Sequence, residues 1–148
     1  MLIEYCTLNC GDDCFTLKSG RGEEAARMGK PTENVVIRFS LAQQGHGGIT
    51  CGSETAGNIK NIYAHNGIIN CKQIIPRLND VDGFTLNNLK IHSQDNKINI
   101  LDGRNILFKN IKFIATKDEI RVYIKGEQSK NIRFKKVHPN VKTVVPKN

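Results

Sequence analysis

One short motif recurs along this chain: an Asn or Gly residue followed by alternating β-forming residues. The repeats start at Asn34, Asn61, Gly83, Asn105 and Asn131, so the starts lie 27, 22, 22 and 26 residues apart, and Leu2-Ile3-Glu4-Tyr5-Cys6 fits the same template. A repeat of this length holds short strands separated by turns and is too short and too polar for a helix pair. Such a period is typical of a parallel β-helix, in which each coil stacks on the previous one and buries a shared core. We therefore predict an all-β parallel β-helix of about six coils.

The recurrent Asn predicts a sharp bend in every coil. Asn tolerates left-handed backbone and bonds to its neighbours, so we expect an interior amide ladder at this position. Residues 20–33 interrupt the period and are expected to form a glycine-bounded loop with one helical turn. We assign residues 1–138 to one β-helix domain. Residues 139–148 are basic and proline-punctuated, and we expect an irregular cap or a disordered tail.

Composition limits the possible partners. The 148 residues correspond to one domain, and no stretch approaches the eighteen apolar residues that cross a membrane. No basic and apolar leader follows Met1, so a secretion signal is not expected. The net charge of +8 would attract any polyanion. Basic residues are spread out, with one dense run at Arg133, Lys135 and Lys136, and aromatic residues are few, so we do not expect nucleic-acid binding.

The five cysteines are an odd number, which leaves at least one free thiol in a monomer. Cys6, Cys10 and Cys14 recur every four residues, which would form a stripe on a helix and suggests a metal site. The intervening residues are poor helix formers, and no Cys-x-x-Cys pair occurs. We therefore interpret the cysteines as small buried hydrophobic residues and predict neither a metal site nor a cofactor.

Two clusters indicate chemistry. The first is Gly11-Asp12-Asp13-Cys14, and the second is Gly45-His46-Gly47-Gly48 with Gly52-Ser53-Glu54 behind it. Two carboxyl groups can divide the work of glycoside hydrolysis, since one protonates the leaving oxygen while the other activates water. Adjacent like charges also raise one pKa, which keeps the acid protonated. As a bare dipeptide, Asp-Asp would more simply be a polar turn.

The sequence around these clusters resembles the polygalacturonase family of glycoside hydrolases. The resemblance covers residues 3 to about 66 and includes the runs 3–20, 31–38 and 45–54, with both family signatures in order. It implies a single-stranded right-handed parallel β-helix of the pectin lyase-like kind. It also implies inverting hydrolysis of pectic, galacturonan-like polysaccharide by a monomeric protein that is secreted or periplasmic.

The resemblance assigns roles to single residues. Asp12 takes the place of the general acid, and Asp13 that of the carboxylate that activates the hydrolytic water. His46 takes the place of the histidine beside them, which tunes the acid and contacts sugar. Neighbouring strand residues point to opposite faces, so both carboxylates serve one cleft only if the backbone bends, and Gly11 would permit that bend.

Other charged residues are weaker candidates. Lys18 and Arg21 are possible contacts for a uronate carboxylate, although ordinary solvated charges are equally compatible. Glu54 could orient the site from behind, and a structural hydrogen-bonding role is the simpler expectation. The family has an Arg-Ile-Lys motif that grips the substrate carboxylate, and this chain offers only the nearby cations Lys72 and Arg77 in that region.

The chain departs from the family in ways that define the alternatives. The family's third aspartate, in an Asn-Thr-Asp motif one coil upstream, is absent from the sequence, as is an Arg-x-Lys motif after the histidine. We therefore expect a truncated relative with weak or no activity, because losing one group of a catalytic unit costs several powers of ten in rate. One alternative is a non-catalytic β-helix that binds anionic polysaccharide. Another is a pectin lyase-type eliminase, disfavoured because no calcium-binding carboxylate cluster is evident.

Overall fold

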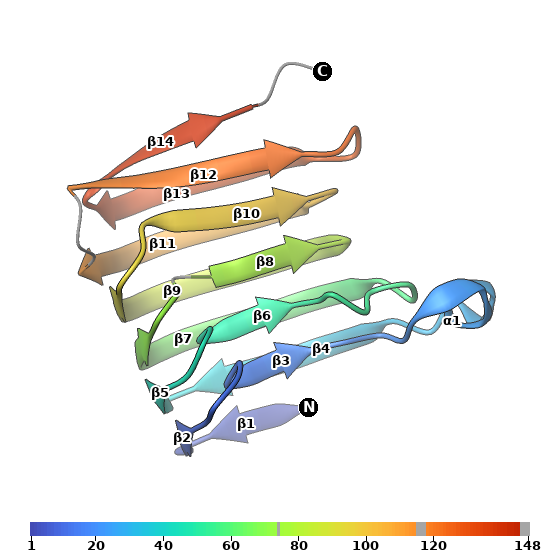
Figure 1. The fold of residues 1–148 in the computed structure, drawn as a ribbon, viewed down its shortest axis with the longest axis horizontal. Coiled ribbons are helices and arrows are strands. Elements are labelled where there is room, and N and C mark those ends of the chain that lie inside the picture. Colours follow the sequence, from blue (N-terminus) through green and yellow to red (C-terminus); the bar gives the residue numbers. More distant parts are fainter. Residues whose placement is uncertain (74, 115–117, 146–148) are drawn as a thin grey trace.

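The chain winds into two sheets of parallel strands that stack along one axis (Figure 1). In this computed structural model, residues 1–73, 75–114 and 118–145 are described. The first sheet has eight strands: β1 (Leu2–Glu4), β2 (Thr7–Asn9), β4 (Thr32–Arg38), β5 (Leu41–Gln44), β7 (Ile59–Cys71), β9 (Val81–Ser93), β11 (Arg104–Ile114) and β13 (Lys130–His138). The second sheet has six: β3 (Phe15–Leu17), β6 (Ile49–Cys51), β8 (Ile75–Asn79), β10 (Lys97–Leu101), β12 (Glu119–Lys125) and β14 (Asn140–Val144).

From β5 onward successive strands alternate between the sheets, and the strands pair in parallel with those of neighbouring rungs, so the predicted parallel β-helix is confirmed. The sequence predicted about six coils, and this number is higher than the number of turns in the structure. The first and last rungs pair on one side only, and about four turns are stacked on both sides. The repeat pattern marks every rung alike, so it does not separate complete coils from terminal ones.

The core lies between the two sheets and repeats in register from rung to rung. In the first sheet, Phe84 pairs with Ile62 and Ile106, and all three are at most 2% exposed. In the second sheet, Ile98 lies beside Val122, and both are fully buried. Each buried side chain of this size contributes about 1.5–3 kcal/mol relative to exposure, so alternation with period two holds the coil shape.

The Asn that begins each repeat adopts left-handed backbone, as predicted. Asn34, Asn61, Asn105 and Asn131 have φ between 53° and 56°, and Gly83 has φ of 82°. The Asn61 Nδ2 donates to Asn34 Oδ1 at 3.2 Å, and Asn131 donates to Asn105 in the same way at 2.6 Å. The four side chains are exposed, so the ladder lies on the surface and the predicted interior position is wrong.

The loop at residues 20–33 holds α1 (Gly22–Met28), which projects from the side of the stack (Figure 1). Glu23 and Glu24 lie in its first turn and Arg27 in its last, which complements the helix dipole. Gly29 ends the helix with φ of 59°, and its N–H donates to the Ala25 carbonyl at 3.1 Å. No residue of α1 is buried, so the helix is a surface insertion between two rungs.

The segment 139–148, expected to be an irregular cap or disordered, contains strand β14. Its Val141 pairs with Ile120 of β12, so the second sheet continues past the boundary placed at residue 138. Val141 and Val144 of this strand are half-buried, whereas Lys142 and Thr143 between them are exposed, and the basic composition concealed the strand. Residues 146–148 of the expected tail lie outside the described residues.

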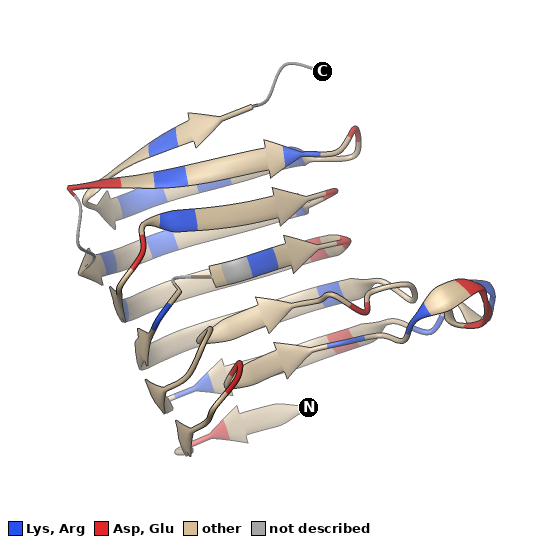
Figure 2. Cartoon of the chain, in the orientation of Figure 1, with Lys and Arg blue, Asp and Glu red and all other residues tan. Residues whose placement is uncertain are grey.

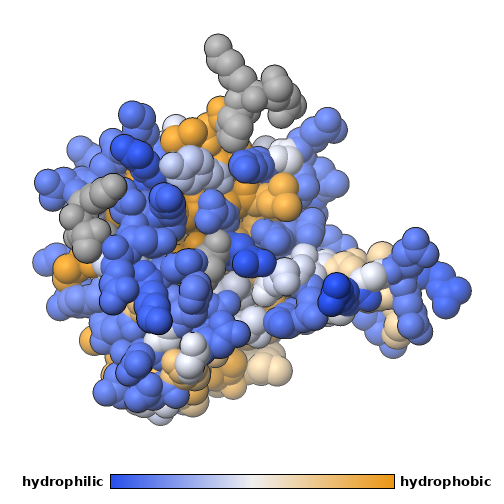
Figure 3. Space-filling view, viewed as in Figure 1, coloured by the Kyte–Doolittle hydropathy of each residue, from blue (hydrophilic) through white to orange (hydrophobic). Residues whose placement is uncertain are grey.

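Charge is distributed differently on strands and turns. In Figure 2, Lys and Arg lie along the strands of both sheets, whereas most Asp and Glu lie at turns or on α1. The face of the second sheet seen in Figure 3 is largely hydrophilic, and hydrophobic surface gathers at the lower end, where β1 lies. Met1 and Leu2 are 78% and 52% exposed there. No helix among the described residues is long and apolar enough to cross a membrane.

Candidate active site

The two sequence clusters occupy the same turn in successive rungs. Residues 10–14 connect β2 to β3, and residues 45–48 connect β5 to β6. The His46 N–H donates to the Asp12 carbonyl at 3.0 Å, and the Cys14 N–H donates to the Gly47 carbonyl at 2.9 Å. Adjacent parallel strands lie about 4.8 Å apart, so Asp12 and His46 are neighbours along the stack. The structure therefore brings together these two predicted residues, which are 34 positions apart in the sequence.

A cation lies in the next rung of the same turn. The Lys72 N–H donates to the Gly45 carbonyl at 3.0 Å, and the Gln73 N–H donates to the His46 carbonyl at 2.8 Å. Lys72 is exposed. Asp12, His46 and Lys72 thus occupy the same turn in three successive rungs along the stack axis.

The two adjacent carboxylates have different surroundings. Asp12 is exposed, whereas Asp13 is half-buried and its Oδ1 is inaccessible to solvent and has no hydrogen-bond partner in the protein. Buried polar atoms are normally paired, because an unpaired one costs about 1–3 kcal/mol. The Oδ1 of Asp13 is therefore an unpaired polar atom that solvent does not reach in this structure.

Three thiols lie behind the turn. The Cys14 Sγ donates to the Gln44 carbonyl at 3.3 Å, and burial together with Cys71 and Cys10 raises the pKa of Cys14 to about 12. Burial also raises the pKa of Cys71, and the charge of Asp13 adds to that shift. All five cysteines are free, Cys51 and Cys71 are buried and the other three are half-buried. Cys51 and Cys71 thus agree with the buried-hydrophobe interpretation, whereas Cys6, Cys10 and Cys14 are only half-buried.

The glycines of the turn have unequal roles. A Cβ at Gly45 would lie 2.7 Å from the Cys14 Sγ and 2.9 Å from the Asp12 carbonyl oxygen, which is closer than packed atoms allow. A Cβ at Gly11 would meet nothing within 4 Å, and Gly11 is not among the residues with positive φ. The chain does bend at Gly11, as expected, but neither the space around this residue nor its φ requires glycine. The close approach that needs glycine is at Gly45, between the two clusters.

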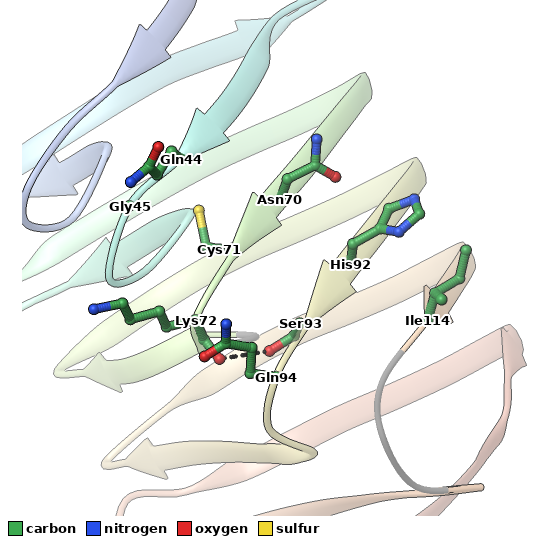
Figure 4. Close-up of a pocket in the computed structure, with 9 residues that line it drawn as sticks. All are labelled: Gln44, Gly45, Asn70, Cys71, Lys72, His92, Ser93, Gln94 and Ile114. Carbon is green, nitrogen blue, oxygen red and sulfur yellow. Dashed lines mark hydrogen bonds between the residues drawn. The ribbon is translucent and has the colours of Figure 1, made fainter.

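An open cavity of about 460 Å³ lies beside the turn (Figure 4). Gln44, Asn70, His92 and Ile114 line it from successive rungs, with Lys72, Ser93 and Gln94 at the turn. The Ser93 Oγ donates to the Lys72 carbonyl at 3.0 Å. Sequence reasoning missed Asn70 and His92, which belong to no motif. The repeat period aligns Asn70 with His92 on neighbouring rungs, and this alignment could have identified the two residues from the sequence.

The remaining predicted residues lie elsewhere. The Lys18 Nζ pairs with Glu54 Oε2 at 2.7 Å at the far end of β3, and this pair lowers the pKa of Glu54. Arg21 immediately precedes α1. Arg77 lies on β8 in the second sheet, where a Cβ at Gly52 would meet its Cδ at 3.1 Å. The structure does not bring these four residues to the turn that carries Asp12.

In the described part of the chain, no group of three or more His, Cys, Asp or Glu residues is arranged to hold a metal ion. No protein-family model matches the chain. A probable polygalacturonase from Vitis vinifera is 37% identical over 65 residues, which are 43% of this chain and 13% of that protein. The match therefore spans a small part of the relative. The partial match and the β-helix fold are consistent with a polygalacturonase-like hydrolase.

Proposed function

We propose that this chain is a glycoside hydrolase of the polygalacturonase type that cleaves galacturonan-like polysaccharide with inversion at the anomeric carbon. The observation that carries the proposal is the stacking of Asp12 on His46 in one turn, fixed by the hydrogen bond from the His46 N–H to the Asp12 carbonyl. The partial relative supports the same reaction class. As in the family that the chain resembles, the protein would act outside the cytoplasm.

In this proposal Asp12 protonates the leaving glycosidic oxygen, and Asp13 takes a proton from the water that attacks the anomeric carbon from the opposite side of the ring. The bond from that carbon to the leaving oxygen breaks as the bond to water forms, so protons and charge balance across the two carboxyl groups. The exposed Asp12 can reach a bound chain, and Asp13 would have to present its other carboxylate oxygen, Oδ2, to the water, because its Oδ1 is closed to solvent. His46 and Lys72 would contact the sugar and its carboxylate from the next two rungs.

The experiment is reducing-end release from polygalacturonate by the wild-type chain and by Asp12→Asn. Asp118→Asn is a matched control, because Asp118 is also exposed but precedes β12 in another part of the stack. We expect weak release that falls at least a hundredfold in Asp12→Asn and is unchanged in the control. Release that is equal in all three proteins would refute the assignment of Asp12. An unsaturated product would indicate elimination in place of hydrolysis.

Binding without cleavage is a second candidate function, and one observation favours it. Lys90, Lys112 and His138 lie in register on β9, β11 and β13, and Lys90 and Lys112 come two residues before His92 and Ile114, which line the cavity. Lys109 and Lys135 form a second row beside them. All five side chains are exposed, and among the described residues none of them forms an ion pair. Rows of cations about 4.8 Å apart match a linear polyanion that runs along the stack.

The binding function predicts that a Lys90→Gln and Lys112→Gln double variant loses affinity for polygalacturonate. Lys97→Gln with Lys125→Gln is the matched control, since both residues are exposed on β10 and β12 of the second sheet. Binding by the wild type should weaken steeply between 50 and 500 mM salt, about as expected for screened surface charges. Equal affinity in the two double variants would exclude the rows as the binding surface.

A further inference from the structure

Four ring side chains gather on the outer face of the first sheet, over its first three rungs. They are Tyr5, Phe39, Tyr63 and His65, and we call them the aromatic platform. Tyr5 is 75% exposed, Phe39 is 43% exposed and Tyr63 is 36% exposed. Large aromatic side chains normally bury most of their surface, so three exposed rings in one contiguous patch indicate a contact surface.

The rings are in contact with one another. Tyr5 and Phe39 stack at 5.4 Å between centroids with an angle of 13° between their planes, and Tyr63 stacks on His65 at 4.7 Å and 25°. Phe39 and His65 connect the two pairs through an edge-to-face contact, with 5.8 Å between their ring centroids and an angle of 69° between their planes. The Asn87 Nδ2 donates to the Tyr63 hydroxyl at 3.1 Å, which holds the end of the platform. The platform is therefore ordered by its own contacts.

Two of the rings occupy backbone positions that do not suit them. One bend in every rung has left-handed φ, and its occupants are Tyr5, Phe39, Asn66, Asn88, Asn110 and Lys136, with φ between 49° and 54°. The three central rungs use Asn, the residue best suited to this backbone, and Asn88 Nδ2 donates to Asn66 Oδ1 at 2.7 Å. Bulky residues with left-handed φ are genuine outliers, and such strain concentrates at binding sites. Folding alone would favour Asn at residues 5 and 39 as well.

The platform lies close to the candidate site and carries a cation. Residues 6–9 separate Tyr5 from the turn of Asp12, and residues 40–44 separate Phe39 from the turn of His46, a span of about 15 Å along the strand direction. The Arg38 guanidinium lies 5.7 Å from the centroid of Phe39. Its Nε and Nη2 pair with Glu4, and a guanidinium has five N–H donors, so it can bond to a second acceptor.

We infer that the aromatic platform is a stacking surface for pyranose rings of the acidic polysaccharide whose cleavage is proposed above. This inference rests on that proposed function for the identity of the sugar. One face of a galacto-configured ring presents C–H groups, which pack on the exposed face of Tyr5 or Phe39, while the ring carboxylate reaches Arg38. A chain held here and at the turn would cross β2 and β5.

The test restores Asn at the strained positions. Oligogalacturonate binding and the melting temperature are measured for the wild type, Tyr5→Asn, Phe39→Asn and the double variant, with Phe39→Tyr to retain a ring. Lys136→Asn is the matched control, because it makes the same change at the same bend of the last rung, away from the platform. We expect affinity to fall about tenfold for each ring removed while the melting temperature stays equal or rises, and Phe39→Tyr and Lys136→Asn to bind as the wild type.

Several results would overturn the inference. Unchanged affinity in the double variant, or a fall in its melting temperature like that of a core substitution, would make the platform structural. The wild type could also bind single-stranded oligothymidylate more tightly than oligogalacturonate. If the Asn variants lost that binding, the ligand of the platform would be a nucleic acid and not a sugar. If reducing-end release proves independent of Asp12 while the Asn variants lose sugar binding, the hydrolase proposal fails and the platform stands. If release depends on Asp12 and the Asn variants bind sugar as the wild type does, the hydrolase proposal stands and the inference about the platform fails.

Discussion

Among single residues, Gly45 has the most direct control over the candidate site. We predict that Gly45→Ala lowers the free energy of unfolding by about 1–3 kcal/mol, because the new Cβ would clash with the Cys14 Sγ and the Asp12 carbonyl oxygen. Gly11→Ala, in the same turn and with open space around its Cβ, should change it by less than about 0.5 kcal/mol. Urea denaturation of both variants measures the difference, and equal midpoints would contradict the geometry of the turn.

The buried thiols predict how stability depends on pH. The folded protein holds the Cys14 proton up to a pKa of about 12, while the unfolded chain releases it near the ordinary value of 9.0. Unfolding therefore releases a proton between these values, so this contribution is complete below pH 9 and is lost as the pH rises toward 12. We expect the melting temperature to fall between pH 9 and pH 11, and to fall less in Cys14→Ala. Equal pH profiles for the two proteins would rule out Cys14 as the cause.

The residue types of the site could be predicted from sequence, but their surroundings could not. Asp12 and His46 are marked by local motifs, and the repeat period predicts that they stack. The burial of Asp13 and the close approach at Gly45 depend on Cys14 and Cys71, which come from rungs far apart in the sequence. No local pattern encodes such contacts, so the sequence does not single out Gly45 as the glycine that the turn requires.

At the scale of structural elements, the left-handed bends hold the rungs in register. Asn88 combines φ of 54° with a 2.7 Å hydrogen bond to Asn66, so Asn88→Ala loses both a tolerated backbone conformation and an amide bond. We predict a loss of about 2 kcal/mol for Asn88→Ala. Asn88→Gly keeps the left-handed backbone accessible and should lose about 1 kcal/mol. Thermal unfolding of the pair separates the two causes, and identical losses would show that backbone strain contributes nothing.

The sequence predicted the elements well where the repeat is regular and less well at the edges. The alternating β-forming residues after each Asn predicted the positions of the strands. The glycines around residues 20–33 predicted the position of the helical insertion. Strand β14 was missed because its lysine-rich surroundings resemble a solvated tail and its half-buried residues, Val141 and Val144, do not alternate with period two. The second left-handed bend was missed because Tyr5 and Phe39 take the place of Asn there.

At the scale of the whole molecule, stability comes from core layers that run through all the rungs. Phe108 is fully buried and stacks on Phe134 at 5.0 Å, and it pairs in register with Leu86. Phe108→Ala should cost about 3–5 kcal/mol. Leu107→Ala, one residue away on the outer face, should cost less than about 1 kcal/mol. Chemical denaturation of the two variants tests the division between core and surface, and similar losses would contradict it.

The candidate site also belongs to the whole molecule, because each rung supplies one of its members. Asp12, His46 and Lys72 share a turn only while three successive rungs keep their register. A shift by one residue in any rung would move its side chain to the other face of the sheet. Core packing and the proposed catalysis would therefore depend on the same alignment, and we expect variants that loosen the core to lose any sugar binding before they unfold.

The measurement that tests the central claim most directly is the configuration of the first product released from α-linked polygalacturonate, followed by proton NMR. Inverting hydrolysis that depends on Asp12 predicts that the β-anomer appears first and that Asp12→Asn releases no product. Initial release of the α-anomer, or product formation that persists in Asp12→Asn, would contradict the mechanism proposed for this turn.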